Sequence, residues 1–227
     1  MKKIWLTIII AIIYLNPVFS QNNTDQNENQ SKQILSIGPY FGFKAGVNGQ
    51  NVQLGRKNGV SLYPVPDFGV SSFLSLNEDY SLGISLDLGY STYSYTLIDS
   101  RFNDKYNFHF AYLTLNPIFY FIYYGIGFTI GYPLNADFGE SIPTENLSFI
   151  AEFNISFTYP ILFDEDIAMN FFAKAGYFLT GVYKNYKEHD PLKDKIPEVP
   201  PDHTSEAFNP RPISLLIGLN YLFTIDN

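Results

Sequence analysis

Four charged residues stand inside segments that otherwise alternate large apolar residues with small or polar ones. They are Lys44, Asp87, Glu152 and Lys174. All four fall on the small or polar side of the alternation, so they are expected to share one face of a sheet. Two cations and two carboxylates can pair there, and a close pair attracts by about 4 kcal/mol at a dielectric constant of about 20, before desolvation is subtracted. We predict a charge network that fills and fixes an enclosed interior; the alternative is a gate or binding site built on the same charges.

Other residue types with catalytic potential lack the spacing that chemistry requires. Gly125, Gly127 and Gly131 give G-x-G-x-x-x-G within an alternating segment, which differs from a nucleotide-binding loop. The three histidines are His109, His189 and His203. No Ser–His–acid spacing accompanies them, and the acidic turn 164–166 lacks the spacing of a calcium loop. The sequence contains no cysteine, so thiolate chemistry is excluded. We therefore predict no catalytic, cofactor or metal site.

The N-terminus has the layout of a secretory signal peptide. Lys2 and Lys3 precede an apolar run, Ile4–Leu15, and the sequence Val18-Phe-Ser20 supplies a cleavage site. A spanning helix needs roughly 20 apolar residues, so this run is too short; a retained N-terminal anchor is the alternative. We predict a signal peptide over 1–20, a flexible polar leader over 21–33 and one domain over 34–227.

The composition narrows the class of protein further. The chain carries a formal net charge of −8, which argues against nucleic acid as a partner. It contains 18 Tyr and 21 Phe, while its single Trp, Trp5, lies in the predicted signal peptide. Beyond residue 20 there is no run of about 18 uncharged apolar residues, so helical membrane spans are not expected. An exported, aromatic-rich chain of this kind is typical of an outer-membrane β-barrel of a Gram-negative cell.

Eight segments show the period of two that is expected of strands. They cover residues 37–47, 68–76, 81–91, 108–120, 124–132, 149–159, 167–180 and 212–223. Long connections at 48–66, about 96–106, 133–147 and 181–211 alternate with short turns. We predict an all-β fold, an eight-stranded antiparallel up-and-down transmembrane barrel, with both chain ends on the periplasmic side.

The fourth of these segments does not keep one phase. If Phe108 and Phe110 face outward, the even-numbered residues form the outer face. If Leu113 and Leu115 face outward, the odd-numbered residues form it. A bulge near Ala111 would reconcile them.

The two faces of the predicted strands differ in a way that assigns the lipid side. The apolar face carries no charge in the seven best-phased segments, and an outward Lys or Arg near the bilayer midplane costs about 2–4 kcal/mol. The apolar face is therefore expected to contact outer-membrane lipid and the polar face to line the lumen. An eight-stranded barrel is just wide enough for side chains to fill, which disfavours a diffusion pore.

Three short motifs resemble those of the PorT-like small outer-membrane β-barrel proteins. Gly42-Phe-Lys44-Ala-Gly46-Val-Asn48 is similar to that family's opening strand, and Leu113-Thr-Leu-Asn-Pro117 is similar to its fourth strand. The closing stretch, with Gly218, Tyr221 and Phe223, resembles the signal that the barrel-assembly machinery reads. The resemblance implies the fold and the outer membrane as location.

We interpret the protein as a non-catalytic outer-membrane barrel with a structural or surface-interaction role. An extracellular ligand would bind through the connections 48–66 and 181–211. Two alternatives remain: a transport or protein-secretion accessory barrel, and a lipid-modifying enzyme with its site at the rim.

Overall fold

The computed structural model describes residues 34–77, 81–163, 167–193, 195 and 206–225. The predicted signal peptide and leader lie outside these residues. The strands are β1 (Leu35–Asn48), β2 (Arg56–Gly59), β3 (Ser61–Leu62), β4 (Asp67–Ser75), β5 (Leu82–Asp99), β6 (Lys105–Phe121), β7 (Tyr124–Asp137), β8 (Ile150–Phe163), β9 (Ile167–Phe178) and β10 (Pro212–Ile225). Three short helical turns complete the described elements: η1 (Thr144–Asn146), α2 (Tyr186–His189) and η3 (Glu206–Phe208). None of the described helices is long and apolar enough to cross a membrane.

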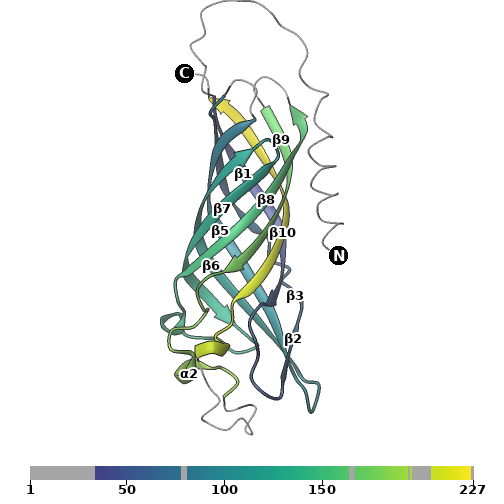
Figure 1. The fold of residues 1–227 in the computed structure, drawn as a ribbon, viewed down its shortest axis with the longest axis vertical. Coiled ribbons are helices and arrows are strands. Elements are labelled where there is room, and N and C mark those ends of the chain that lie inside the picture. The colour runs from purple at the N-terminus through teal and green to yellow at the C-terminus, as the bar shows by residue number, and fades with distance from the viewer. Residues whose placement is uncertain (1–33, 78–80, 164–166, 194, 196–205, 226–227) are drawn as a thin grey trace, which may run out of the picture. The chain divides into compact units, whose positions relative to one another are not determined.

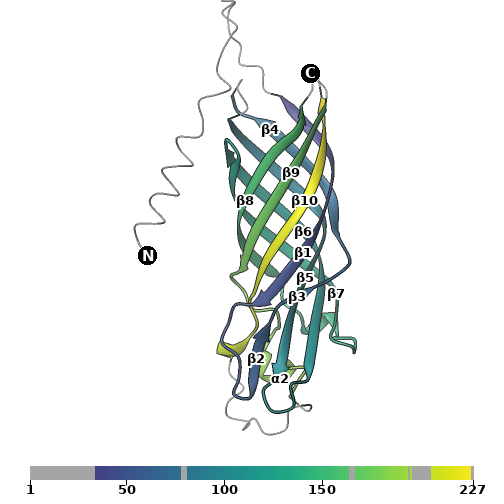
Figure 2. The same ribbon diagram turned by 90° about the vertical axis from the view of Figure 1, so that its right-hand side faces the viewer.

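The sheet closes into a ring through eight long strands (Figures 1 and 2). Neighbours are antiparallel in the order β10-β9-β8-β7-β6-β5-β4-β1, and β10 pairs again with β1, from Leu35 opposite Ile225 to Asn48 opposite Pro212. The predicted fold class is confirmed. The start of β1 and the end of β10 lie at the same end of the barrel as the short turns. We call this the turn end, and the opposite end, where the long connections gather, the mouth end.

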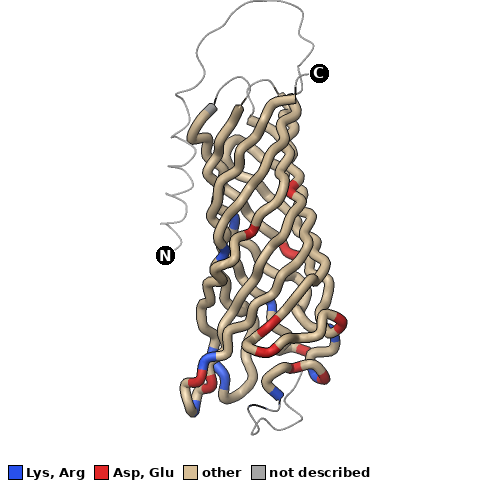
Figure 3. Tube along the Cα trace, turned by 180° about the vertical axis from the view of Figure 1, so that it is seen from behind, with Lys and Arg blue, Asp and Glu red and all other residues tan. Residues whose placement is uncertain are grey.

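The outer surface of the barrel carries a belt of exposed apolar side chains. Seven of the eight long strands each contribute a side chain that is between 42% and 61% exposed: Phe41, Val70, Leu86, Leu115, Ile126, Ile155 and Ile217. Leu179, which directly follows β9, is 44% exposed. The charged side chains at the level of this belt face the interior in the described chain. Figure 3 shows that charged residues are concentrated at the mouth end and are sparse along the wall. Exposing such a belt of apolar side chains to water would be unfavourable, whereas contact with lipid removes the free-energy cost of hydrating them.

The first long connection is not a simple loop, as was predicted for 48–66. Residues 56–75 form one interrupted strand, in which β2 pairs with β5, β3 pairs with β1, and β4 pairs with both. The interruption falls at Tyr63-Pro-Val-Pro66, where the two prolines have no N–H to give to a ladder. Tyr63 stacks on the ring of His109, with centroids 4.2 Å apart.

The loop predicted at 96–106 is also shorter than expected, because β5 continues to Asp99 and β6 begins at Lys105. Residues 91–97 are buried without alternation. Their outward side chains lie under the interrupted strand: the Ser94 hydroxyl donates to the Ser61 carbonyl oxygen at 3.2 Å. A strand that is covered on both faces does not alternate between apolar and polar residues. This part of β5 could therefore not be recognised as a strand from the sequence.

The phase slip predicted in β6 is wrong. Phe108 and Phe110 face inward, each 1% exposed, in the same phase as Thr114 further along the strand. A register shift does occur beside Ala111, but the extra residue belongs to β7, where Leu134 and Asn135 are both exposed. Large aromatic side chains were assumed to face lipid, whereas these two fill the mouth of the barrel.

Candidate functional site

The four charged residues selected from the sequence all face the lumen, but only two of them pair with each other. Lys174 on β9 lies 2.9 Å from Asp87 on β5, measured from Nζ to Oδ2. Asp87 also accepts hydrogen bonds from Ser71 Oγ at 2.6 Å and from Asn116 Nδ2 at 3.3 Å. Asn154 extends this group, because its Nδ2 donates to the Asn116 oxygen at 3.0 Å. The pair therefore sits within polar contacts contributed by five strands.

Lys44 pairs with a carboxylate that lies between the predicted loop 48–66 and the predicted strand 68–76. Its Nζ lies 2.7 Å from Oδ2 of Asp67, and the two side chains are 5% and 1% exposed. Asp67 also accepts from Ser91 Oγ at 2.5 Å, and from the backbone N and Oγ1 of Thr92 at 2.8 and 2.7 Å. The Lys44 ammonium lies 3.6 Å from the centroid of the Tyr93 ring, within cation–π range. Asp67 thus has four donors, as many as Asp87, which also accepts from Ser85 Oγ at 3.3 Å.

Glu152, on β8, is held by hydroxyl groups. It accepts from Tyr93 at 2.7 Å and from Ser214 at 2.9 Å, and it is 3% exposed. No Lys or Arg of the described chain lies within ion-pair distance of it. The ring of Tyr93 contacts the Lys44 ammonium, and its hydroxyl donates to Glu152. Tyr93 therefore links the Glu152 carboxylate to the Lys44–Asp67 pair. A buried carboxylate without an adjacent cation depends on such donors.

The space left between these groups is very small. The larger lumen cavity measures about 20 Å³ and is lined by Lys44, Asp67, Asp87, Glu152 and Lys174 among others. A second cavity, of about 10 Å³, lies beside Tyr40, Asp87 and Lys174. A water molecule needs roughly 10–15 Å³ by the same measure. The larger cavity therefore has room for one water molecule and is too small for an organic substrate.

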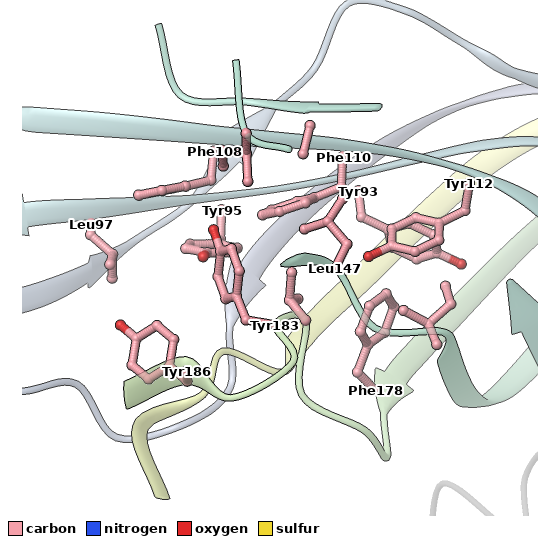
Figure 4. Packing of buried hydrophobic residues seen from close by; sticks show 14 of the residues in the cluster. Tyr93, Tyr95, Leu97, Phe108, Phe110, Tyr112, Leu147, Phe178, Tyr183 and Tyr186 are labelled. Carbon is pink, nitrogen blue, oxygen red and sulfur yellow. The ribbon is translucent and has the colours of Figure 1, made fainter. Parts of the chain in front are cut away.

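A second set of side chains closes the mouth end above the lumen charges. This aromatic plug joins residues from β5, β6 and β9 with Leu147, which precedes β8, and with residues that follow β9 in the chain (Figure 4). Its large members are Tyr93, Tyr95, Phe108, Phe110, Tyr112, Leu147, Phe178, Tyr183, Tyr186 and Leu192, each at most 2% exposed. Phe178 meets Tyr93 edge to face, with centroids 4.6 Å apart. The start of the connection 181–211 is therefore folded into the barrel.

One buried ion pair ties the first long connection to the last. The guanidinium of Arg56, at the start of β2, binds both carboxylate oxygens of Asp190, at 2.9 and 3.2 Å, and both side chains are 1% exposed. It also donates to the Tyr186 hydroxyl at 3.2 Å. Burial, reinforced by the charge of Asp190, raises the pKa of the Tyr186 hydroxyl above its ordinary value, so this group stays protonated. We call the three residues the mouth latch; no pattern in the sequence indicated it.

Replacing Arg56 with glutamine is expected to loosen the 181–195 segment while leaving the barrel closed. Removal of one partner leaves Asp190 as a buried, uncompensated charge. Cleavage by trypsin after Lys187 or Lys193, followed by mass spectrometry, should accelerate on the order of tenfold or more, because local opening exposes these sites. Arg101→Gln, a change of the same type in the neighbouring turn, serves as the control. Equal cleavage of wild type and Arg56→Gln would show that the latch does not hold the segment.

The remaining sequence candidates are separated from one another. His109 lies on the outer face, 3.5 Å from Asp137, and His189 ends α2. His203 and the acidic turn 164–166 lie outside the described residues. The glycines 125, 127 and 131 face inward along β7 and continue the strand. Within the described part of the chain, no group of His, Cys, Asp or Glu has the arrangement of a metal site.

The predicted assembly signal lies at the turn end of β10. Gly218 faces the lumen opposite Gly42 of β1, while Phe223 faces outward and is 45% exposed. The Tyr221 and Phe223 rings meet edge to face at 4.9 Å. Recognition of this stretch by assembly machinery stays a prediction.

Comparisons with known proteins give distant structural likenesses. No protein-family model matches the chain, and a search of the curated proteins finds no match. The outer membrane protein OprG from Pseudomonas aeruginosa is similar over 87% of this chain and 97% of its own, with 9% identity and a TM-score of 0.40. Ail, the attachment invasion locus protein of Yersinia pestis, solved with the heparin analogue sucrose octasulfate, is similar over 83% of this chain and 99% of its own, with 12% identity and a TM-score of 0.34. The fold assignment rests on the strand pairing of the chain itself.

Proposed function

We propose that this protein is a non-catalytic, non-conducting barrel of the outer membrane that acts at the cell surface through its mouth end. The observation that carries the proposal is the filling of the interior. The lumen is occupied by paired charges around a cavity of about 20 Å³, and the aromatic plug lies above it. Neither a permeating solute nor a substrate has room there, so interaction is left to the outside of the mouth.

The placement in the membrane follows from the distribution of apolar and charged side chains. The exposed belt surrounds the barrel, and the charged side chains at its level face inward. Long strands crossing a bilayer at a tilt of about 35–45° match this belt. Long connections of such barrels are extracellular and short turns periplasmic, so the mouth end is external and both chain ends are periplasmic.

The proposed partners follow from the same orientation. The belt contacts outer-membrane lipid, and the barrel-assembly machinery would read Gly218, Tyr221 and Phe223. The resemblance to PorT-like barrels supports this location. An extracellular ligand would meet the connections 48–66 and 181–211, which the mouth latch joins into one surface.

Reconstituted protein is expected to give no single-channel conductance above that of the lipid alone. Ions would have to cross the aromatic plug and two ion pairs that leave only water-sized cavities. Planar-bilayer recordings across a range of voltages measure this, with a general porin as positive control. Reproducible conductance steps in the wild type would reject the closed interior and favour the transport alternative.

A different measurement distinguishes the proposed non-catalytic barrel from the alternative of a lipid-modifying enzyme with its site at the rim. Mass spectra of lipid A from a strain that lacks the protein should match those of the parent strain. A changed acylation pattern, restored by the wild-type protein, would favour the lipid-modifying alternative instead.

A further inference from the structure

The mouth end carries one projection, formed by residues 53–59 and 96–105, which we call the arm. In the arm β2 pairs with the end of β5, and β5 pairs with the start of β6. Tyr90 is the last large apolar residue on the outward face of β5 before Ile98. Eight residues at about 3.3 Å each, tilted by about 40°, place Ile98 about 20 Å beyond Tyr90. The exposed Val60 and Leu62 lie on the strand that covers this stretch of β5. Figure 2 shows β2 at the opposite end of the barrel from the β4 label. The arm tip thus lies beyond the apolar outward face of β5, at the mouth end.

The tip exposes two large apolar side chains on neighbouring turns. Leu54 is 81% exposed and Phe102 is 72% exposed, more than the side chains of the belt. They lie on two turns joined by a hydrogen bond from the Ser100 N to the Gly55 carbonyl oxygen, at 2.7 Å. Gly55 adopts a φ of +85°, which favours glycine and shapes the first turn. The ordered backbone therefore holds both apolar groups on joined turns, largely uncovered by the described chain.

Cations flank this apolar tip. Lys57 and Lys105 are the two outer residues of a cross-strand row whose centre is Ile98, and both lysines are exposed. Neither forms an ion pair with a described residue. Arg101 lies beside Phe102, with its guanidinium carbon 5.4 Å from the ring centroid. Of the four cations in the arm, Arg56 is buried against Asp190 and Arg101 pairs with Asp99, so the exposed lysines 57 and 105 supply the positive charge at the tip.

We propose that the arm tip docks onto an anionic lipid bilayer other than the one the barrel spans. Projecting Leu and Phe side chains enter the apolar layer, while the flanking Lys and Arg side chains stay at the level of anionic headgroups. An acidic protein or a sulfated glycan would satisfy the cations but leaves Leu54, an aliphatic group on a projecting turn, without an apolar pocket. The inference rests on the proposed function, because it requires the mouth end to be external.

The test uses the full-length protein in nanodiscs of neutral phosphatidylcholine, which leave both ends of the barrel accessible. These are mixed with vesicles of 70% phosphatidylcholine and 30% phosphatidylglycerol, or of phosphatidylcholine alone, and binding is measured by flotation. We expect wild type to bind the anionic vesicles at least tenfold more than the neutral ones. Leu54→Ser/Phe102→Ser and Lys57→Glu/Lys105→Glu should each reduce that binding by at least tenfold. Lys187→Glu/Lys193→Glu makes the same charge change on another external segment and should leave binding unchanged.

A tryptophan reporter shows whether the tip enters the bilayer. Because Trp5 is the single tryptophan of the chain and lies in the predicted signal peptide, Phe102→Trp supplies a distinct fluorophore. Its emission should shift to the blue with anionic vesicles, whereas Thr144→Trp on another external loop should not shift. Equal binding by wild type and the arm variants, an equal loss in the control pair, or binding to heparin or an acidic protein without vesicle binding would each overturn the inference. Those results leave the closed, surface-exposed barrel intact, since conductance tests it separately.

Discussion

Asp67→Asn is expected to lower the free energy of unfolding of the barrel by about 3–5 kcal/mol, because it leaves the Lys44 ammonium as an unpaired charge in the lumen. Lys44 and Asp67 are 5% and 1% exposed, so water cannot replace the lost carboxylate. The Asn side chain keeps an oxygen that can accept from Thr92, and the loss therefore reports chiefly on the charge. Urea unfolding in lipid vesicles, followed by far-ultraviolet circular dichroism, measures the change.

Two further variants separate the charge effect from a general loss of packing. Asp104→Asn makes the same substitution at an exposed turn residue and should change the unfolding free energy by less than about 0.5 kcal/mol. Adding Lys44→Met to Asp67→Asn removes the stranded cation and should restore most of the stability. If the double variant is no more stable than Asp67→Asn alone, the ion pair does not stabilise the lumen.

Leu86→Arg is expected to prevent most of the protein from reaching the folded barrel. Leu86 faces outward from β5, is 43% exposed and lies within the belt, opposite Ser72 and Pro117 on the neighbouring strands. An arginine near the bilayer midplane costs about 2–4 kcal/mol. The readout is the fraction of unboiled protein that migrates differently from boiled protein on SDS gels, after refolding into vesicles.

The matched control introduces the same arginine outside the belt. Leu54 is more exposed than Leu86 but lies at the arm tip, so Leu54→Arg should leave the folded fraction unchanged. Ser85→Thr, a small change on the lumen side of the same strand, should also have a much weaker effect than Leu86→Arg. Comparable folding of Leu86→Arg and wild type would mean that the outward face of β5 does not contact lipid.

The sequence was informative wherever a strand separates lipid from the lumen. There the two faces have different surroundings, so apolar residues alternate with small or polar ones. The ends of the eight strands could be located within about three residues, except at the extended mouth ends of β5 and β7 and the turn end of β8. The signal failed where both faces are covered by protein, as in residues 91–97, and where the inward face is aromatic, as at Phe108 and Phe110. Alternation measures a difference between surroundings, and at the mouth end that difference disappears.

The same difference explains which residues of the candidate site could be predicted from the sequence and which could not. Lys44, Asp87, Glu152 and Lys174 were recognisable because a charge is conspicuous in an alternating segment. Asp67 was not recognised, because it follows Pro66 and precedes the first residue of the predicted strand. Arg56 and Asp190 lie in non-periodic connections, 134 positions apart, so no local pattern could have joined them.

The separation of the latch residues also sets an order of events during folding. Contacts between neighbouring strands close short loops, whereas the Arg56–Asp190 pair spans more than half of the chain and gains its position only after β9 stands beside the growing wall. The latch is therefore among the last contacts to form. A barrel that has not yet completed its wall lacks the Arg56–Asp190 pair, so resistance of residues 181–193 to cleavage is expected to report completion of the wall.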